Sequence, residues 1–188
     1  MKEKDNMPRL CVFAGAASGN SASFATTSFE IGKSLSQAGF SFIYGGGRTG
    51  LMGAFADGVI EAGGDIQGVI PQFLEDVEKA HQGVSKMVVT TTMHERKMLM
   101  YEPADGFLIL PGGLGTLDET MEVLTWRQLG RLNGPVFIYS PNGYWAPMQE
   151  LLAHITDEGF VHTKEVEDTF WLEDVDAIEK TAKDFFSN

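Results

Sequence analysis

The chain has 188 residues, which is enough for one domain with a sizeable hydrophobic core. Hydrophobic residues make up 43% of the sequence and charged residues 21%, and both are ordinary values for a globular protein. The formal net charge of -12 repels nucleic acids and anionic membranes, so the composition argues against both as partners.

The N-terminal segment and the single cysteine indicate the compartment. Residues Met1–Asn6 are charged and lack the apolar stretch of a secretion signal. No uncharged apolar run reaches the ~18 residues that are needed to span a bilayer. Cys11 is the one cysteine, which leaves no intrachain disulfide and no cysteine-based zinc site. The sequence therefore predicts a soluble, cytoplasmic protein.

Strand-like apolar runs alternate with helical segments along the chain. In chain order, the predicted strands are Arg9–Phe13, Ser41–Tyr44, Ile66–Ile70, Lys86–Thr90, Gly106–Leu110, Val136–Tyr139 and Thr169–Leu172. The predicted helices are Phe24–Ala38, Leu51–Ala62, Met93–Glu102, Thr116–Leu129, Tyr144–Glu158 and Val175–Phe186. The irregular, polar segment Gln72–Ser85 is predicted to be a short helix plus loop.

This alternation predicts the fold class. Strands and helices that alternate, with glycines where helices end, are typical of a parallel sheet with helices on both faces. No internal repeat, low-complexity segment or domain linker interrupts the pattern. We therefore predict a single doubly wound, Rossmann-like α/β domain that extends over residues 1–188.

Three glycine-rich loops directly follow three of the predicted strands. They are Ala14–Ser21, Gly45–Gly53 and Pro111–Glu119. In an open parallel sheet the carboxyl ends of the strands lie along one edge, where ligands bind. One glycine turn is more often structural than functional, but three on the same edge favour a ligand-binding crevice.

The loop Pro111–Glu119 is the most informative of the three. It joins a buried strand to an amphipathic helix, so backbone N–H groups and the helix dipole would favour an anion there. Glu119 lies in the first turn of that helix, beside the proposed anion. A carboxylate next to an anion is repelled by it, and its presence therefore indicates catalysis.

The loop Gly45–Gly50 also fits G-x-G-x-x-G, the pattern of dinucleotide-binding proteins. However, it follows the second strand, and the acidic residue near the expected distance, Asp65, opens a strand instead of ending one. No Lys-Ser or Lys-Thr follows a glycine loop, so ATP-driven chemistry is not indicated either. We expect close approach of a phosphate to this backbone, but no redox dinucleotide.

The segment Met93–Lys97 begins the helix before the Pro111–Glu119 strand and loop. Two adjacent cations, Arg96 and Lys97, oppose the helix dipole there unless an anion is nearby. A solvated basic pair would be the structural explanation. An arginine fork and a lysine point charge suit a phosphate, and in so acidic a chain they would attract an anionic substrate locally.

Three carboxylates, Asp118, Glu119 and Glu122, lie in the helix after Pro111. Acidic residues early in a helix favour its dipole, so a purely structural explanation stays open for them. Glu119 and Glu122 are three residues apart and share a helix face. The histidines show no spacing typical of metal ligands and the carboxylates form no evident cluster, so we expect no metal.

Together these motifs resemble the LOG ("lonely guy") family of cytokinin riboside 5′-monophosphate phosphoribohydrolases, often labelled "possible lysine decarboxylase". The family motifs P-G-G-x-G-T-x-x-E and M-H-x-R-K stand here as Pro111–Glu119 and Met93–Lys97. A third element, Y-G-G-G-x-x-G-L-M-G, is present as Tyr44–Gly53. The similarity extends over essentially the whole chain.

The resemblance implies a nucleotide-binding domain that hydrolyses the N-glycosidic bond of a nucleoside 5′-monophosphate. The substrate would be AMP or an N6-substituted AMP, and the products would be the free base and ribose 5-phosphate. By motif matching, Arg96 and Glu119 are the expected catalytic pair. The expected substrate-binding residues are Gly45, Gly46, Gly47, Glu78, Met93, Arg96, Lys97, Gly112, Gly113, Leu114, Gly115 and Thr116. We expect no cofactor and a homodimer.

The residue types suit this chemistry. Departure of the base leaves an oxocarbenium-like ribosyl centre, which a nearby carboxylate can stabilise while it orients water. Glu119 is the candidate for that role, and the positive loops would hold the phosphate and so position the ribose. Two roles stay open for Arg96, which would either fix the phosphate or orient Glu119.

The first glycine loop departs from the family pattern. Relatives commonly have Cys-Gly-Ser-Ser where this chain has Ala14 to Ala17. Ala14 and Ala16 replace two potential side-chain groups. If the family uses that hydroxyl on the phosphate, this chain relies on backbone N–H groups and Ser18, and its substrate preference would differ.

Two other functions stay open from the sequence alone. A non-catalytic nucleotide-binding or carrier protein could use the same fold, although the intact Arg96 and Glu119 positions favour catalysis. Lysine decarboxylation would need pyridoxal phosphate on a lysine, and Lys97 could serve only by abandoning the phosphate. For the homodimer, the candidate contact residues are Leu117, Met121, Leu124 and Trp126, which the monomer core would bury equally well.

Overall fold

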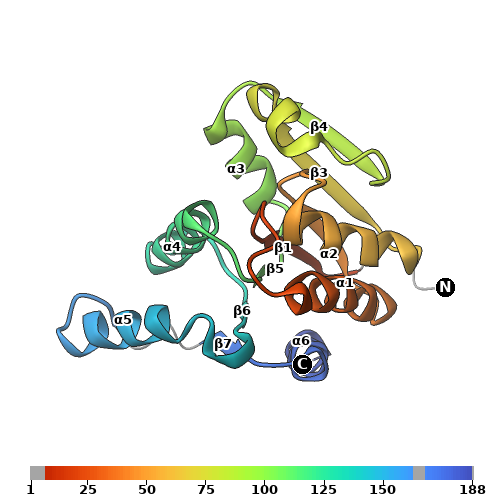
Figure 1. Cartoon of the computed structure of the whole chain (residues 1–188). Coiled ribbons are helices and arrows are strands. Elements are labelled where there is room, and N and C mark those ends of the chain that lie inside the picture. Colours follow the sequence, from red (N-terminus) through yellow and green to blue (C-terminus); the bar gives the residue numbers. More distant parts are fainter. Residues whose placement is uncertain (1–6, 163–167, 188) are drawn as a thin grey trace.

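A seven-stranded parallel sheet forms the centre of the computed structural model, which describes residues 7–162 and 168–187 (Figure 1). Its strands are β1 (Arg9–Phe13), β2 (Ser41–Tyr44), β3 (Ile66–Pro71), β4 (Lys86–Thr90), β5 (Gly106–Ile109), β6 (Val136–Tyr139) and β7 (Thr169–Leu172). They lie in the order β4-β3-β2-β1-β5-β6-β7, and all neighbouring pairs are parallel.

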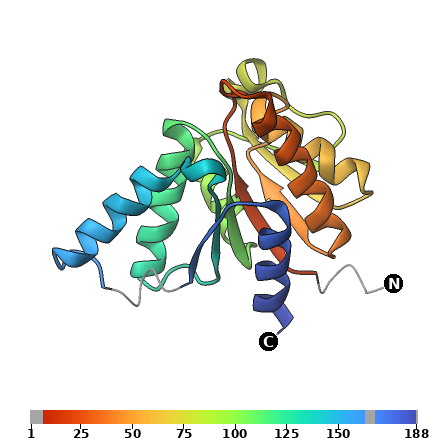
Figure 2. The ribbon, with the colours of Figure 1, turned by 60° about the horizontal axis from the view of Figure 1, so that its bottom comes forward.

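Helices cover both faces of the sheet (Figure 2). On one face lie α1 (Ala22–Gln37), α2 (Gly50–Glu61) and α6 (Val175–Ser187). On the other face lie α3 (Met93–Tyr101), α4 (Leu114–Gln128) and α5 (Ala146–Asp157). Short helical turns, η2 (Gln72–Leu74), η3 (Glu75–Lys79) and η4 (Pro141–Gly143), occupy connections between these elements.

The strands are apolar throughout because both of their faces are buried. Along β1, Leu10 and Val12 point into the core beneath α1 and α2, whereas Cys11 and Phe13 point into the core beneath α3 and α4. All four side chains are at most 2% exposed. This two-sided burial fixes the position of each strand end, and with it the position of each loop at the carboxyl edge.

Helices α1 and α2 approach each other closely through glycines. A Cβ atom on Gly32 would lie 2.3 Å from the Phe55 carbonyl oxygen, and one on Gly58 would lie 2.0 Å from that of Phe29. Any larger residue at these positions would therefore push the two helices apart. Because α1 and α2 follow the first two glycine loops in the chain, their close packing holds these loops in place.

The predicted fold class is confirmed, and each predicted strand and helix is present with its ends within two residues of the prediction. The largest shifts, of two residues, occur at the starts of α1, α4 and α5. Helix α4 begins at Leu114, two residues before the predicted start, because Gly113 already serves as its N-cap. Helix α5 begins only at Ala146, because Asn142 adopts a φ of 51° in the preceding turn and Pro147 opens the helix.

The strand order reverses direction at β1, which places a crevice between the carboxyl ends of β1 and β5. The loops after these two strands contact each other directly, since the Gly15 N–H donates to the Pro111 carbonyl at 3.0 Å. The described part of the chain contains no helix that is both long enough and apolar enough to span a membrane.

Candidate active site

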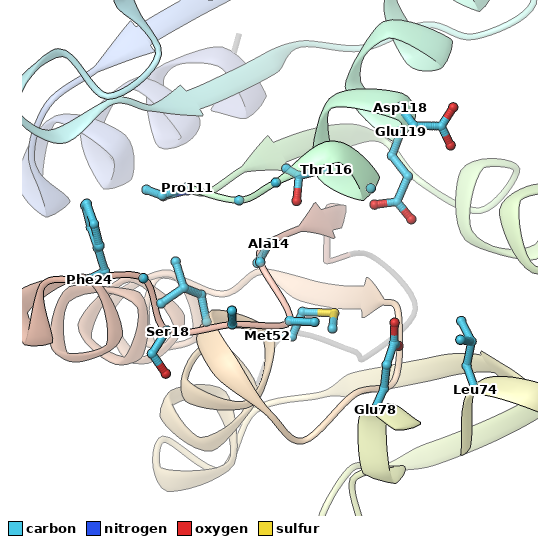
Figure 3. Close-up of a pocket in the computed structure, with 18 of the residues that line it drawn as sticks. Ala14, Ser18, Phe24, Met52, Leu74, Glu78, Pro111, Thr116, Asp118 and Glu119 are labelled. Atoms are coloured by element: carbon cyan, nitrogen blue, oxygen red, sulfur yellow. The ribbon is translucent and has the colours of Figure 1, made fainter. Parts of the chain in front are cut away.

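A cavity of about 560 Å³ opens at the reversal point of the sheet (Figure 3). Its walls come from the loops after β1 and β5, the starts of α2, α3 and α4, the η2–η3 segment, and Tyr144 after β6. All three predicted glycine loops thus contribute to one crevice, the second of them through Leu51 and Met52, as their position on the sheet edge predicted. The cavity is large enough for a nucleotide-sized ligand.

The N-terminus of α4 presents an anion-binding surface to this cavity. The N-cap residue is Gly113, so no side chain accepts from the first amides of the helix. The N–H groups of residues 114–116 have no carbonyl within the helix to bond, and the helix dipole adds positive potential there. Gly112 is required beside this turn, because a Cβ there would lie 2.0 Å from Thr116 Oγ1.

The first loop lines the same end of the cavity through its backbone. In Figure 3 the Ser18 hydroxyl points away from the Pro111–Thr116 turn. The Gly15 carbonyl accepts from the N–H groups of Leu51 (2.9 Å) and Met52 (3.3 Å) at the start of α2. The N-terminus of α2 therefore holds the first loop in place and does not offer these amides to a phosphate.

Gly45, Gly46 and Gly47 lie outside the cavity lining, and their expected contact with the substrate stays a prediction. Gly45 and Gly47 pack against residues that line the cavity, whereas Gly46 packs against Val69, Ile70 and Met87. A Cβ on Gly45 would lie 2.1 Å from Arg96 Nη2, and one on Gly47 would lie 3.4 Å from the Glu78 side chain. The close backbone approach at Gly45 leaves room for the Arg96 guanidinium.

Arg96 enters the cavity wall from the first turn of α3 and is 5% exposed. Its Nε donates to the Val69 carbonyl at 3.1 Å and its Nη2 to the Gly45 carbonyl at 2.9 Å. Nη2 also lies 3.6 Å from Glu78 Oε2. The backbone carbonyls at the ends of β2 and β3 thus fix the guanidinium in the cavity wall, where it can orient carboxylates.

Glu119 projects into the cavity from the second turn of α4 (Figure 3). Surrounding protein desolvates its carboxylate and raises its pKa to about 7, although Arg96 and Lys97 oppose the shift. The side chain keeps some exposed surface on the cavity side. A carboxyl with a pKa near neutrality can accept or hold a proton under physiological conditions, as general acid–base catalysis requires.

Glu78 points into the cavity from the wall opposite Glu119 (Figure 3). Its side chain is 16% exposed, and its Oε2 atom is buried with no hydrogen-bond partner among the described residues. Burial raises the pKa of this carboxyl, and the neighbouring Arg96 guanidinium limits the rise. The site therefore contains two facing carboxyls whose charged forms are both disfavoured by desolvation.

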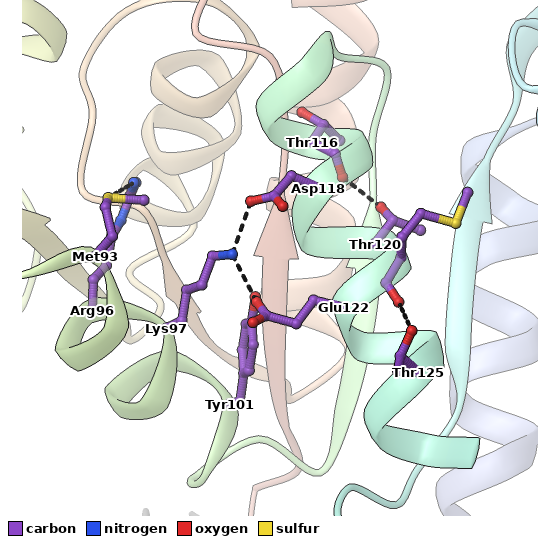
Figure 4. A network of polar contacts seen from close by, with 10 residues as sticks. Met93, Arg96, Lys97, Tyr101, Thr116, Asp118, Thr120, Glu122 and Thr125 are labelled. Carbon is purple, nitrogen blue, oxygen red and sulfur yellow. Dashed lines mark hydrogen bonds and ion pairs between the residues drawn. The ribbon is translucent and has the colours of Figure 1, made fainter. Parts of the chain in front are cut away.

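Lys97 lies outside the cavity lining, and its expected contact with the nucleotide stays a prediction. Its Nζ atom pairs with Asp118 Oδ2 and Glu122 Oε2, both at 2.8 Å (Figure 4). The Tyr101 hydroxyl donates to the same Glu122 oxygen at 2.9 Å. This network ties α3 to α4 directly behind the catalytic candidates, so Lys97 acts on Glu119 through charge and position.

The remaining predicted residues differ in their placement. Met93, Gly112, Gly113, Gly115 and Thr116 line the cavity as expected. The Leu114 side chain is 85% exposed and lies outside the lining, so only its backbone N–H can face a ligand.

Sequence reasoning missed several wall residues, among them Phe24, Met52, Leu74 and Tyr144. The Tyr144 hydroxyl donates to the Gly112 carbonyl at 2.7 Å and so braces the anion-binding turn. Its position after β6, at the carboxyl edge of the sheet, was the one signal that could have identified it. Phe24 and Leu74 lie in helical segments without a distinguishing pattern, whereas Met52 belongs to the Y-G-G-G-x-x-G-L-M-G element.

Within residues 7–162 and 168–187, no group of three or more His, Cys, Asp and Glu side chains is arranged to hold a metal ion. The chemistry available is therefore that of an anion site at a helix N-terminus, one carboxyl a turn further along that helix, and a second carboxyl across the cavity. The buried Arg96 guanidinium lies 3.6 Å from the second carboxyl, Glu78, and its charge lowers the pKa of both carboxyls.

Comparison with known proteins extends these observations. A family described as "Possible lysine decarboxylase" matches residues 52–181. The cytokinin riboside 5′-monophosphate phosphoribohydrolase of Rhodococcoides fascians is 39% identical over 153 residues, which cover 81% of this chain and 77% of that protein. The enzyme of the same name, LOG1 of Arabidopsis thaliana, is 36% identical over 161 residues, or 86% and 76% of the two chains.

Solved structures show a shared fold. The molybdenum cofactor carrier protein of Chlamydomonas reinhardtii has a TM-score of 0.72 to this chain, with 97% of this chain and 99% of that chain covered. The two sequences are only 18% identical, so this likeness carries no conclusion about the ligand.

Proposed function

Because the chain belongs to the LOG family of cytokinin riboside 5′-monophosphate phosphoribohydrolases, which are enzymes, we propose that it hydrolyses nucleoside 5′-monophosphates. The bond cleaved is the N-glycosidic bond of AMP or of an N6-substituted AMP. The products are the free base and ribose 5-phosphate. The observation that carries this proposal is Glu119, a carboxyl of raised pKa one turn from a helix N-terminus in a nucleotide-sized cavity.

The cavity geometry supports one orientation of the nucleotide in the site. The 5′-phosphate binds the free N–H groups at the start of α4, where the helix dipole favours an anion. The ribose then extends along α4 toward Glu119, and the base lies beyond it. Phosphate binding, remote from the reacting carbon, thus contributes the energy that positions C1′.

Glu119 has two tasks in the reaction. In its ionised form it stabilises the oxocarbenium-like ribosyl centre, and it accepts a proton from the water that attacks C1′. Arg96 keeps Glu119 partly ionised by charge, because it lowers the pKa that desolvation raises. Since backbone carbonyls already hold the guanidinium, we assign Arg96 to orienting carboxylates in preference to fixing the phosphate.

The experiment that tests this function is a product assay with purified protein. AMP, N6-isopentenyl-AMP and other nucleoside monophosphates are incubated with the wild-type chain and with Glu119→Gln. We expect base release by the wild type and none by Glu119→Gln. Nucleotide binding by calorimetry without any base release would instead indicate a carrier. Full activity of Glu119→Gln would show that the assigned mechanism is wrong.

The environment of Lys97 argues against lysine decarboxylation. A lysine that forms a Schiff base needs a neutral amine. Desolvation lowers the pKa of Lys97, but hydrogen bonds to Asp118 and Glu122 outweigh this effect and leave the pKa raised. Two carboxylates therefore hold Lys97 as an ammonium. An absence of pyridoxal absorbance after incubation of the protein with pyridoxal phosphate would agree with this argument.

The homodimer remains a prediction. Of the helix residues considered for such a contact, Leu124 belongs to the monomer core, and Leu117 and Met121 pack against that core. Light scattering on the purified protein would give the oligomeric state directly.

A further inference from the structure

The Glu78 carboxylate lacks part of the hydrogen bonding that a buried carboxylate needs. Its Oε2 atom is buried and has no hydrogen-bond partner in the described part of the chain. The 3.6 Å to Arg96 Nη2 is an ion-pair distance and too long for a good hydrogen bond. A buried oxygen without a partner is unfavourable and is rare in folded proteins. Because this oxygen lies in the cavity wall, a bound ligand is the natural partner.

The backbone holds Glu78 at this position with unusual local structure. Residues 75–79 form a single π-helical turn, η3, and Lys79 at its end has a φ of 53°. The Arg48 N–H lies 3.1 Å from the Glu78 carbonyl and 3.0 Å from that of Lys79, and the Gly47–Ala80 bridge continues this contact. Turns of this kind and left-handed non-glycine residues concentrate at functional sites, where surrounding contacts stabilise the strain.

The surroundings of Glu78 suit the base of a nucleotide. Leu74 and Met93 provide apolar cavity wall at this end, which a flat purine ring can contact. Glu78 and Glu119 enter the cavity from opposite walls (Figure 3). In glycosidic hydrolysis the leaving group and the attacking water occupy opposite faces of the ribosyl carbon when displacement is direct. The two carboxyls are placed to serve these two faces separately.

The reaction needs a proton donor that Glu119 cannot supply while it activates water. A purine that leaves as an anion is a poor leaving group, whereas a purine that gains a proton on a ring nitrogen leaves as a neutral molecule. A carboxylic acid beside the base meets this requirement. Burial favours the protonated form of Glu78 by raising its pKa. After Glu78 has given up its proton, the positive charge of Arg96 stabilises the carboxylate that remains.

We propose that Glu78 is the general acid of the reaction, a role that rests on the proposed function. The Glu78 carboxyl gives its proton to a ring nitrogen of the base as the C1′–N bond electrons pass to that base. A water molecule forms the new C1′–O bond and gives a proton to the Glu119 carboxylate. After product release, solvent returns the proton from Glu119 to Glu78, so the net change is addition of one water.

The test compares two leaving groups in Glu78→Gln. AMP needs a proton on its departing base, whereas 4-nitrophenyl β-ribofuranoside 5-phosphate releases a stable nitrophenolate that needs none. We expect Glu78→Gln to lower kcat on AMP by about 10²- to 10⁴-fold and to stay within about tenfold of wild type on the nitrophenyl substrate. Glu119→Gln should lose activity on both, and Glu78→Asp should recover part of the AMP activity because it keeps an acid.

The matched control is Glu75→Gln, on the same π-helical turn but outside the cavity lining, which should leave both activities unchanged. Circular dichroism establishes that each variant folds. An equal loss on both substrates would overturn the proposal, because it would assign Glu78 to ribose binding, and so would unchanged AMP activity. If the wild type hydrolyses neither substrate, the proposed function itself fails and the role of Glu78 with it.

Discussion

Replacing Glu119 by glutamine should stabilise the folded protein at neutral and alkaline pH. Desolvation raises the pKa of Glu119 from its ordinary value of 4.5 to about 7, so the folded chain holds this proton more tightly than the unfolded chain. The stability that the proton confers is complete below about pH 4.5 and is lost as the pH rises through about 7. Glutamine is close in shape and remains neutral, so Glu119→Gln avoids this loss.

The magnitude follows from the pKa difference. A carboxyl with this difference destabilises the fold by about 3 kcal/mol once it is fully ionised. Solvent that reaches the cavity side of the carboxylate screens part of this destabilisation. Glu119→Gln should therefore raise the free energy of unfolding by about 2 kcal/mol at pH 8 and by less than about 1 kcal/mol at pH 5. For a chain of this size, about 2 kcal/mol raises Tm by roughly 4–8 °C.

Urea unfolding of wild type and Glu119→Gln at pH 5 and pH 8 measures this difference. The control is Glu150→Gln, an exposed glutamate on α5, whose effect on the unfolding free energy should be the same at both pH values. The reasoning is refuted if Glu119→Gln is equally stable relative to wild type at pH 5 and pH 8, or is less stable at pH 8. Such a result would mean that the surrounding protein does not desolvate this carboxyl.

Three further predictions concern activity. The kcat/KM of the wild type should give a bell-shaped pH profile, because Glu119, with a pKa of about 7, must lose its proton while Glu78 must keep the proton that it donates. Lys97→Met removes a cation that lowers the pKa of Glu119, so the part of the pH profile that follows Glu119 should shift to higher pH. The control Lys183→Met, on the exposed face of α6, should not shift it. An unshifted profile in Lys97→Met would contradict the effect of Lys97 on Glu119. Gly45→Ala adds a Cβ 2.1 Å from Arg96 Nη2 and so displaces the guanidinium. This variant should lower kcat by at least about tenfold. A wild-type kcat in Gly45→Ala would contradict a role of Arg96 in the mechanism.

Much of the architecture could be predicted from the sequence because local and global signals agree. Apolar runs such as Val136–Tyr139 have no polar face and can only be strands buried on both sides. Parallel strands bring their following loops to one edge, which was enough to predict that the three glycine loops converge on one crevice. The structure places Gly15 and Pro111 in direct hydrogen-bond contact there.

Lys97 shows what the sequence pattern leaves open. Adjacent residues on a helix point about 100° apart, so the side chains of Arg96 and Lys97 start in different directions. The motif is continuous in sequence, but its two cations serve different surfaces. Arg96 lies in the cavity wall and Lys97 joins the interface between α3 and α4.

The loop Gly45–Gly47 and Glu78 could not be placed for a different reason. Glycines permit close approach without indicating what approaches, and at Gly45 the Arg96 guanidinium does so. Glu78 lies in an irregular segment whose π-helical turn has no periodic signature, so only the family resemblance pointed to it. Its unpartnered oxygen becomes visible only in three dimensions.

The most direct test of the central claim is the identity and stoichiometry of the products from AMP, measured by mass spectrometry at early and late times. Cleavage at the ribosyl carbon predicts adenine and ribose 5-phosphate in equal amounts, with no adenosine and no inorganic phosphate. Adenosine with phosphate would place the reaction at the phosphate ester. AMP recovered intact after prolonged incubation, despite binding, would contradict catalysis altogether.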